Sequence, residues 1–316
     1  MIKKKTNFHQ SFLIFLMGPT ASGKSKLAMK LRKYLPVELI SVDSALIYRN
    51  MDIGTSKPNS VQLTQHPHRL INIKDPIQYY SAAEFRHDVL IEINNIIQLG
   101  KIPLLVGGTM FYYYTLLNGI AKLPASNLIL RQKILHESNY NDNYSLHKYL
   151  SKIDINSANN IHPNDIQRLL RALEICLTTG KKFSKLKKNI LIKLPYRIIQ
   201  FVKVLKKQKL YNYIQSRFHK MLDQGFELEV QGLLNRGDLN INLPAIRCIG
   251  YRHMWLYLSN VISYNEMIKQ SIFATRKLVK KQLTWLKNWK NLYILKDQHI
   301  NLTIEKILNI IYKNII

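Results

Sequence analysis

Residues 11–25 read SFLIFLMGPTASGKS, an apolar run followed at once by a glycine-containing loop. The last eight of these residues fit the pattern G-x-x-x-x-G-K-[ST] without a mismatch. In this pattern the glycines let backbone N–H groups curl around phosphate oxygens, and the N-terminus of the following helix adds partial positive charge. We therefore predict a buried strand over 11–17, a phosphate-binding loop, and a helix that begins at Lys24.

The predicted diphosphate site is this loop. Lys24 contributes a full positive charge, and the hydroxyl of Ser25 is the candidate ligand for Mg²⁺, the expected cofactor. The motif specifies a bound di- or triphosphate and does not specify ATP. The loop residues are Gly18, Pro19, Thr20, Ala21, Ser22, Gly23, Lys24 and Ser25.

The chain continues with the alternation of strands and helices that is typical of an α/β protein. Apolar runs at 37–42 and 102–106 predict two more buried strands, and 24–35 and 83–99 predict helices. This order indicates a P-loop core built on a doubly wound parallel sheet.

After about residue 120 the pattern changes to short helices, with no strand signal until 196–205. Residues 181–188 (KKFSKLKK) form a basic, linker-like run, and 208–290 read as almost wholly helical. We expect residues 1–119 and 196–316 to form the core with a helical C-terminal part, whose last residues are peripheral. Residues 120–195 would then be a helical insertion.

The strongest compositional feature is charge. The chain has 47 Lys and Arg against 19 Asp and Glu, for a formal net charge of +28. Such an excess favours a polyanionic partner, because each neutralised phosphate releases condensed counterions. Charge alone indicates binding to nucleic acid or to another acidic surface.

Two features favour a cytoplasmic protein. Cys176 and Cys248 are far apart and show no metal-ligand spacing, which fits a reducing compartment. Lys3–Lys5 before the apolar run at 12–17 resemble a signal peptide, but this run is short and leads directly into the phosphate loop. No stretch is long enough to span a membrane, so we expect no membrane partner.

Polar residues follow two of the predicted strands. Asp43 ends the run at 37–42, and Thr109 follows the glycine pair at 107–108 and could cap the next helix. Because ligands of open α/β sheets bind at the carboxyl ends of the strands, Asp43, Thr109 and the phosphate loop should face one crevice. On position alone, the alternative role of Asp43 is a helix cap or a group near Mg²⁺.

Eight segments are distributed over nearly the whole chain: GPTASGKS (18–25), ISVDSALIYRNMDIGTSKP (40–58), PHRL (67–70), YSAAEFR (80–86), PLLVGGTMFY (103–112), HPNDIQRLLRALEI (162–175), DLNINLPAIRCIGYRHMW (238–255) and ATRKLVKKQLTWLKNW (274–289). Together these segments resemble the bacterial tRNA dimethylallyltransferase family. His253 and Asn72 depart from the family pattern, as do Lys281 and Lys287, which stand where Arg is usual. The Lys-for-Arg changes keep the charge and lose bidentate geometry, which puts individual phosphate contacts in doubt.

The resemblance implies transfer of a dimethylallyl group from dimethylallyl diphosphate to an adenine beside the anticodon of tRNA, by a monomeric protein. The implied catalytic residues are Asp43 as general base, Lys24 and Ser25 at the diphosphate, and Arg217 as a clamp on the diphosphate. The implied tRNA contacts are Asp43, Ser44, Ala45, Leu46, Thr109, Arg131, Gln167, Arg168, Leu169, Leu170, Arg171, Arg247, Cys248, Ile249, Gly250, Tyr251, Arg252, Lys280, Lys281, Gln282, Leu283, Thr284, Trp285, Leu286 and Lys287.

Helical periodicity divides the two predicted RNA-facing helices into faces. In 162–175, Gln167, Arg168 and Arg171 share one side, opposite a row of apolar residues. In 274–289, basic residues share a face, and we expect Trp285 and Trp289 to lie in the core.

Two other functions fit parts of the sequence. A P-loop kinase acting on a nucleoside or small metabolite would share the phosphate loop, but would not need the large basic helical half. A nucleotide-regulated RNA-binding protein without covalent chemistry would share both features. The resemblance favours prenyl transfer over each.

Overall fold

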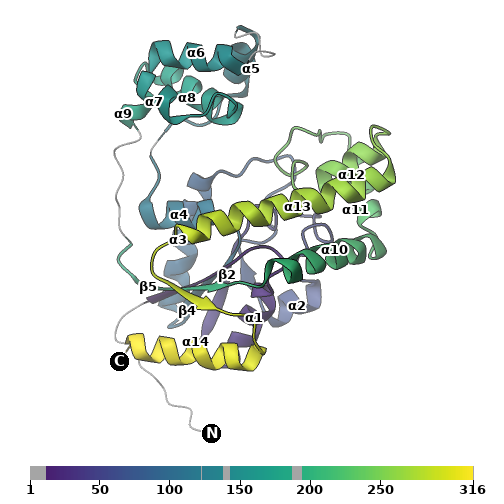
Figure 1. Ribbon diagram of the computed structural model, residues 1–316. Coiled ribbons are helices and arrows are strands. Elements are labelled where there is room, and N and C mark those ends of the chain that lie inside the picture. The colour runs from purple at the N-terminus through teal and green to yellow at the C-terminus, as the bar shows by residue number, and fades with distance from the viewer. Residues whose placement is uncertain (1–11, 122, 138–142, 187–193, 316) are drawn as a thin grey trace. The chain divides into compact units, whose positions relative to one another are not determined.

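The computed structural model describes residues 12–121, 123–137, 143–186 and 194–315 (Figure 1). Ser11, Lys3–Lys5 and the last two residues of the basic run at 181–188 lie outside this description. The chain divides into two compact units, one made of residues up to 115 together with 195–316, and one made of 116–194. The sequence pattern predicts boundaries at 119/120 and 195/196.

The larger unit is built on one six-stranded sheet. All of its strands run parallel, and their order is β3-β2-β4-β1-β5-β6. This arrangement confirms the predicted doubly wound parallel sheet. The strands are β1 (Phe12–Met17), β2 (Val37–Val42), β3 (His68–Arg69), β4 (Ile102–Gly107), β5 (Arg197–Lys203) and β6 (Leu292–Leu295).

Helices cover both faces of this sheet. Alternate residues of β1, such as Ile14 and Leu16, pack against α1 and α14, while Phe15 on the other side contacts Tyr113 of α4. The helices that begin in this unit are α1 (Lys24–Leu31), α2 (Ser60–Gln65), α3 (Ala82–Gln98), α4 (Met110–Asn118), α10 (Lys207–Asp223), α11 (Phe226–Leu234), α12 (Tyr251–Leu258), α13 (Tyr264–Lys287) and α14 (Ile300–Ile315).

Three expectations about this unit need correction. The first helix ends at Leu31, four residues before the predicted end, because 32–35 form a turn that leads into β2. Residues 208–290 are interrupted by a non-helical stretch between α11 and α12. The C-terminal residues are not peripheral, since β6 extends the sheet and α14 buries Ile304, Ile307 and Ile311 in the core shared with α1.

The smaller unit is wholly helical in its described residues, and two buried carboxylates organise it. Asp154 accepts hydrogen bonds from the backbone and hydroxyl of both Ser157 and Ser184. Glu174 accepts from Asn127, Arg131 and Arg171. The helices are α5 (Leu128–Glu137), α6 (Asn143–Ile153), α7 (Ile155–Asn160), α8 (Ile166–Thr179) and α9 (Phe183–Leu186).

Among the described residues, none of the helices combines the length and apolar character that crossing a bilayer requires.

The packing of α14 against α1 predicts a stability effect far from the phosphate loop in sequence. Ile307 is 0% exposed, whereas Leu302 on the same helix is 54% exposed. Ile307→Ala should lower the free energy of unfolding by about 2–5 kcal/mol, because it leaves a cavity in the core. Leu302→Ala should change it by less than about 0.5 kcal/mol. Urea denaturation of both variants measures the change in the free energy of unfolding. Equal changes in the two variants would contradict the packing of α14 against α1.

Candidate active site

The phosphate loop connects β1 to α1 in a conformation that only certain residues tolerate. Gly23 has φ 80° and Ala21 has φ 62°, both in the left-handed region. A side chain at Gly18 would place its Cβ 2.5 Å from the carbonyl oxygen of Lys203 at the end of β5. The loop therefore lies close against the carboxyl end of the neighbouring strand, with one non-glycine residue, Ala21, held in a strained conformation.

Lys24 turns its ammonium back into this loop. The Nζ atom donates to the carbonyl oxygen of Pro19 at 2.7 Å and lies 3.5 Å from the hydroxyl of Ser22. Burial lowers the pKa of Lys24 to about 7, although Asp43 acts to raise it; the positive charge of Arg217 lowers it further. The protein therefore provides little negative charge to balance the ammonium of Lys24.

A second cation lies beside the loop. Arg217 of α10 donates from Nη1 to the hydroxyl of Thr20 at 3.4 Å and from Nη2 to the carbonyl oxygen of Thr55 at 3.1 Å. Burial lowers the pKa of Arg217, with Asp43 again opposing the shift. Two desolvated cations therefore share one nearby carboxylate, which leaves a net positive site suited to an anion.

Asp43 occupies the turn directly after β2. Its Oδ1 accepts from the backbone N–H groups of Ala45 at 2.9 Å and Leu46 at 3.4 Å, which orients the carboxylate. The N–H of Ser44 donates to the hydroxyl of Thr109 at 3.2 Å, so this hydroxyl joins the ends of β2 and β4. Asp43 also contributes to raising the pKa of Cys248 to about 12, after burial itself.

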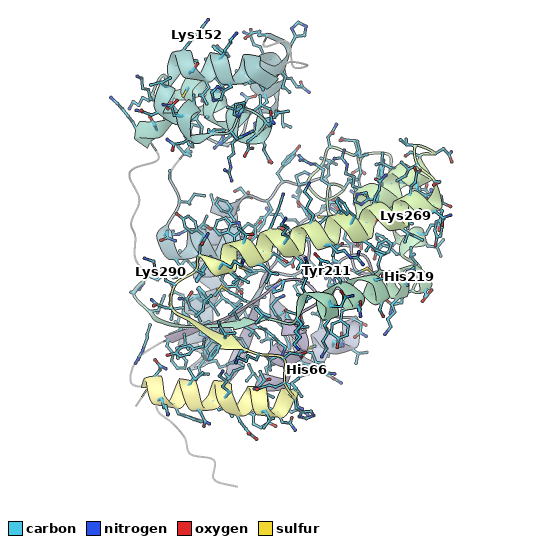
Figure 2. All side chains as sticks on the ribbon, in the orientation of Figure 1. His66, Lys152, Tyr211, His219, Lys269 and Lys290 are labelled. Atoms are coloured by element: carbon cyan, nitrogen blue, oxygen red, sulfur yellow. The ribbon has the colours of Figure 1, made fainter. Side chains whose placement is uncertain are left out.

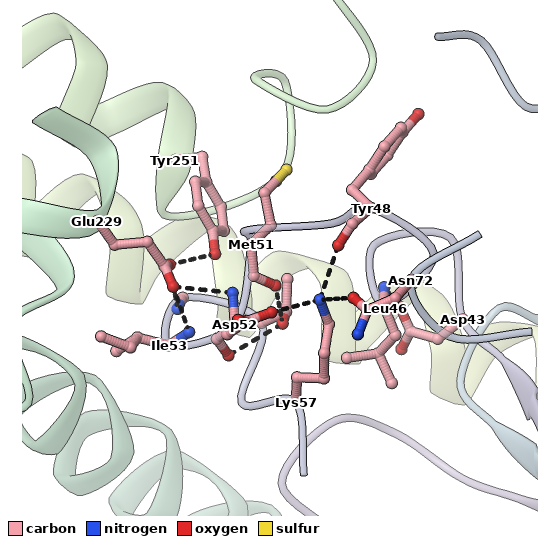
Figure 3. Close-up of polar contacts among 12 residues, drawn as sticks. Asp43, Leu46, Tyr48, Met51, Asp52, Ile53, Lys57, Asn72, Glu229 and Tyr251 are labelled. Atoms are coloured by element: carbon pink, nitrogen blue, oxygen red, sulfur yellow. Dashed lines mark hydrogen bonds and ion pairs between the residues drawn. The ribbon is translucent and has the colours of Figure 1, made fainter. Parts of the chain in front are cut away.

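The loop that supplies Thr55 is anchored by Glu229 of α11 (Figure 3). Oε2 of Glu229 accepts from the N–H groups of Asp52 at 2.8 Å and Ile53 at 2.7 Å. Oε1 accepts from the N–H of Gly54 at 3.1 Å and from the hydroxyl of Tyr251 at 2.6 Å. Three successive backbone N–H groups around one carboxylate form an anion-binding nest that fixes the loop.

Lys57 fixes the other side of the same loop. Its side chain is 2% exposed and donates to the carbonyl oxygen of Tyr48 at 2.7 Å, to Asp52 at 2.5 Å and to Asn72 at 2.6 Å. Asn72 is one of the positions that depart from the family pattern, and its amide oxygen still accepts from Lys57. Glu229 and Lys57 therefore both hold this loop in place (Figure 3).

Gln282 of α13 makes contacts that the sequence did not predict. Its Oε1 accepts from the backbone N–H of Thr20 at 3.0 Å, and its Nε2 donates to the carbonyl oxygen of Gly108 at 2.9 Å. The side chain is 7% exposed. The amide of Gln282 is therefore used within the protein, and a tRNA contact at this position stays a prediction.

The predicted RNA turn at 247–252 is only partly exposed. Arg247 and Arg252 are exposed, and Cys248 and Ile249 are half-buried. Tyr251 is fully buried, with its ring edge-on to Phe226 and its hydroxyl bonded to Glu229. The ring of Tyr251 therefore packs within the protein, and an RNA contact at this position stays a prediction. Gly250, with φ 92°, provides the sharp turn into α12.

The C-terminal half of α13 presents a basic outer surface. Lys280, Lys281, Thr284 and Lys287 are exposed. Leu286 is buried and Leu283 half-buried, so these apolar side chains face the protein.

The two tryptophans near the end of α13 differ in their surroundings. Trp285 is 38% exposed and lies edge-on to exposed Tyr114, 5.7 Å between ring centroids. The core position predicted for Trp285 is thus wrong. Trp289, in contrast, is half-buried and donates its indole N–H to Gln200 at 2.8 Å.

The residues of the smaller unit that are predicted to contact tRNA divide into exposed residues and residues that pack or pair within the unit. Gln167 and Arg168 are exposed on α8, while Leu169 is buried and Leu170 half-buried in the core of the unit. The side chain of Leu169 therefore packs within the unit, as its helical periodicity predicts, and a tRNA contact at this position stays a prediction. Arg131 and Arg171 are both ion-paired to Glu174, at 3.0 and 2.6 Å, so each has a structural partner within the unit.

A hollow of about 600 Å³ lies between α10 and α13. His219 and Lys269, which line it, are labelled in Figure 2 with Tyr211 of the same helix pair. No residue of the phosphate loop lines this hollow, and neither Asp43 nor Arg217 does. It is therefore distinct from the candidate active site.

The sequence matches known proteins over most of its length. The profile of the IPP transferase family matches residues 46–289. A tRNA dimethylallyltransferase from Buchnera aphidicola subsp. Acyrthosiphon pisum (strain APS) is 57% identical over 313 residues, which cover 98% of each chain.

The chain belongs to the IPP transferase family.

Solved structures agree with this placement in the IPP transferase family. The tRNA isopentenylpyrophosphate transferase of Bacillus halodurans is 32% identical, with a TM-score of 0.70 and 97% of each chain covered. A eukaryotic dimethylallyltransferase acting on tRNA is 26% identical, with a TM-score of 0.77, covering 92% of this chain and 75% of the other.

The low pKa of Lys24 predicts a pH dependence of anion binding. A bound diphosphate favours the protonated amine, so affinity should be full below a pH of about 7 and fall as the pH rises through this value. Above that pH, Lys24 should take up a proton when pyrophosphate binds. Titration calorimetry with magnesium pyrophosphate, in buffers of different ionisation enthalpy, measures this uptake.

Lys24→Arg provides the control, because a guanidinium stays charged over the whole range. Any pH dependence that remains in this variant belongs to pyrophosphate itself. Identical proton uptake by the wild type and Lys24→Arg would contradict the assignment to Lys24.

Proposed function

We propose that this protein transfers a dimethylallyl group from dimethylallyl diphosphate to the N6 amine of the adenine immediately 3′ of the anticodon in tRNA, giving N6-isopentenyladenosine and diphosphate. Its membership of the IPP transferase family supports the reaction class. The observation that carries the assignment to this site is the grouping of Lys24, Arg217 and Asp43 at the carboxyl ends of the strands.

The difficult part of the reaction is the departure of diphosphate. The adenine amine is a weak nucleophile because its lone pair is delocalised into the ring, so catalysis depends on stabilising the leaving group. Lys24 and Arg217 both lie beside the phosphate loop with poorly compensated charge. We propose that they bind the diphosphate and stabilise the negative charge that builds up as the bond breaks.

In the proposed transfer of the allyl group, the carboxylate of Asp43 acts as the base. The N6 lone pair forms a bond to the first carbon of the allyl group, and the carbon–oxygen bond to diphosphate breaks with its electron pair on oxygen. The alkylated amine becomes acidic, and its proton passes to the carboxylate of Asp43. The two N–H donors that hold Oδ1, from Ala45 and Leu46, keep the carboxylate oriented for this transfer.

RNA binding is proposed for basic surfaces on both units. In the larger unit the exposed candidates are Arg247, Arg252 and the outer face of α13. In the smaller unit they are Gln167 and Arg168. Asp43 is half-buried, and an adenine must leave its stack before its amine can reach such a carboxylate, so a splayed anticodon loop is the expected substrate. We expect the protein to act as a monomer in the cytoplasm.

Mg²⁺ fits the donor groups beside the loop. Ser25 is exposed at the start of α1, and among the described residues no cluster of three acidic, imidazole or thiol side chains could hold a metal. Mg²⁺ commonly takes one or two protein ligands and fills the rest of its shell with phosphate oxygens and water. We propose that Ser25 would hold Mg²⁺ together with the diphosphate, where the ion would neutralise phosphate charge.

The experiment that tests this function is incubation with dimethylallyl diphosphate and unmodified tRNA. Mass spectrometry of the digested tRNA should find isopentenyladenosine. Turnover of ATP without this nucleoside would favour the kinase alternative, and tight RNA binding with neither product would favour a binding protein.

Asp43→Asn separates catalysis from diphosphate binding. The amide oxygen of Asn can still accept from the backbone of 45 and 46, but it cannot take up the amine proton. At saturating substrates kcat should fall by about 10²–10⁴-fold. Pyrophosphate binding, measured by calorimetry, should be retained or strengthened, because a negative charge near two cations is removed. An unchanged kcat in Asp43→Asn would rule out this carboxylate as the base.

A further inference from the structure

Gln282 joins three segments that are distant in sequence. It lies on α13 and bonds to the backbone of Thr20 in the phosphate loop and of Gly108 after β4. Both functional groups of the amide are used, and the side chain is buried. A buried amide satisfied at both ends fixes the spacing between its partners.

The contact at Thr20 supports the strained part of the loop. Thr20 is held at its backbone by Gln282 and at its hydroxyl by Arg217. The next residue, Ala21, has φ 62°, a conformation that costs a residue with a side chain about 1 kcal/mol or more. Such strain persists only where the surrounding contacts enforce it, and Gln282 provides one of these contacts.

Gly108 shows how closely this contact is packed. A Cβ at Gly108 would lie 2.6 Å from Nε2 of Gln282 and 3.3 Å from the carbonyl oxygen of Gly18. Any side chain at 108 would therefore push the amide of Gln282 away from the loop. The glycine after β4 leaves room for the contact between α13 and the phosphate loop.

We propose that Gln282 is a positioning residue for the diphosphate: it holds Thr20 and Ala21 in the conformation that binds pyrophosphate, and Gly108 provides the space it needs. The inference rests on the proposed function, because it names the residue that preorganises that site. Gln282 acts on the loop and not on RNA, although it lies on the helix whose outer face is basic.

The experiment is a double-mutant cycle with three variants of the full chain: Gln282→Ala, Gly108→Ala and the double substitution. Magnesium pyrophosphate is the probe, its Kd is measured by calorimetry, and the Kd for an anticodon stem-loop RNA and the melting temperature are measured in parallel. Ser271→Ala is the matched control, since Ser271 is also a buried polar side chain on α13 but bonds only within its helix.

Each single substitution should weaken pyrophosphate binding by about tenfold, because each removes the restraint on Thr20. The double variant should bind much more tightly than the product of the two single losses predicts, because the methyl group at 108 then has no amide to displace. What remains is its closer contact with the carbonyl oxygen of Gly18, 3.3 Å from the added Cβ. The Kd for RNA should stay within about twofold, and Ser271→Ala should leave both Kd values unchanged.

Several outcomes would overturn the inference. Unchanged pyrophosphate binding in Gln282→Ala, with only a lower melting temperature, would make the residue structural. Losses that multiply in the double variant would show that positions 108 and 282 act separately. If Gln282→Ala does not fold, Gln282→Met decides, because it keeps most of the side-chain volume and removes both hydrogen bonds of the amide. A wild-type protein that does not bind pyrophosphate would defeat the proposed function itself.

Discussion

The structure depends on two desolvated cations that share one carboxylate. Lys24 and Arg217 both lose hydration beside the phosphate loop, and burial lowers the pKa of each. Asp43 compensates only part of this charge. An isolated protein carrying such a site has an electrostatic cost that an incoming polyanion relieves. The hydrogen bonds that fix the surrounding segments keep both cations in place, and relaxation of either cation into solvent would weaken the attraction for an anion.

The segments that hold the cations come from the whole length of the larger unit. Arg217 donates a hydrogen bond to the carbonyl oxygen of Thr55, and the loop that contains Thr55 is held by Glu229 of α11 and by Lys57. Thr20 is held by Gln282 from near the end of α13. The C-terminal helices therefore do more than add a basic surface, because they determine the shape of a loop formed by the first strand and helix.

Local sequence patterns predicted the phosphate loop and the position of Asp43, but not the residues that hold them in place. The strand, loop and helix around GPTASGKS follow from short-range rules, and so does the placement of Asp43 at a strand end. Tyr251, Leu169 and Gln282 lie in segments that resemble RNA-contacting ones, but a segment does not reveal which of its side chains point inward. Glu229 had no signal at all, since its partners are backbone N–H groups of a distant loop. The burial of the C-terminal strand and helix was missed because it depends on tertiary contact with α1, which the local pattern does not reveal.

The most direct measurement is a crystal structure with a non-reactive thiolo analogue of dimethylallyl diphosphate and Mg²⁺. The diphosphate should lie within hydrogen-bonding distance of the phosphate loop, Lys24 and Arg217, with the allyl carbon on the side of Asp43. A diphosphate bound elsewhere, such as the hollow between α10 and α13, or an allyl group directed away from Asp43, would contradict the proposed role of the two cations and the carboxylate.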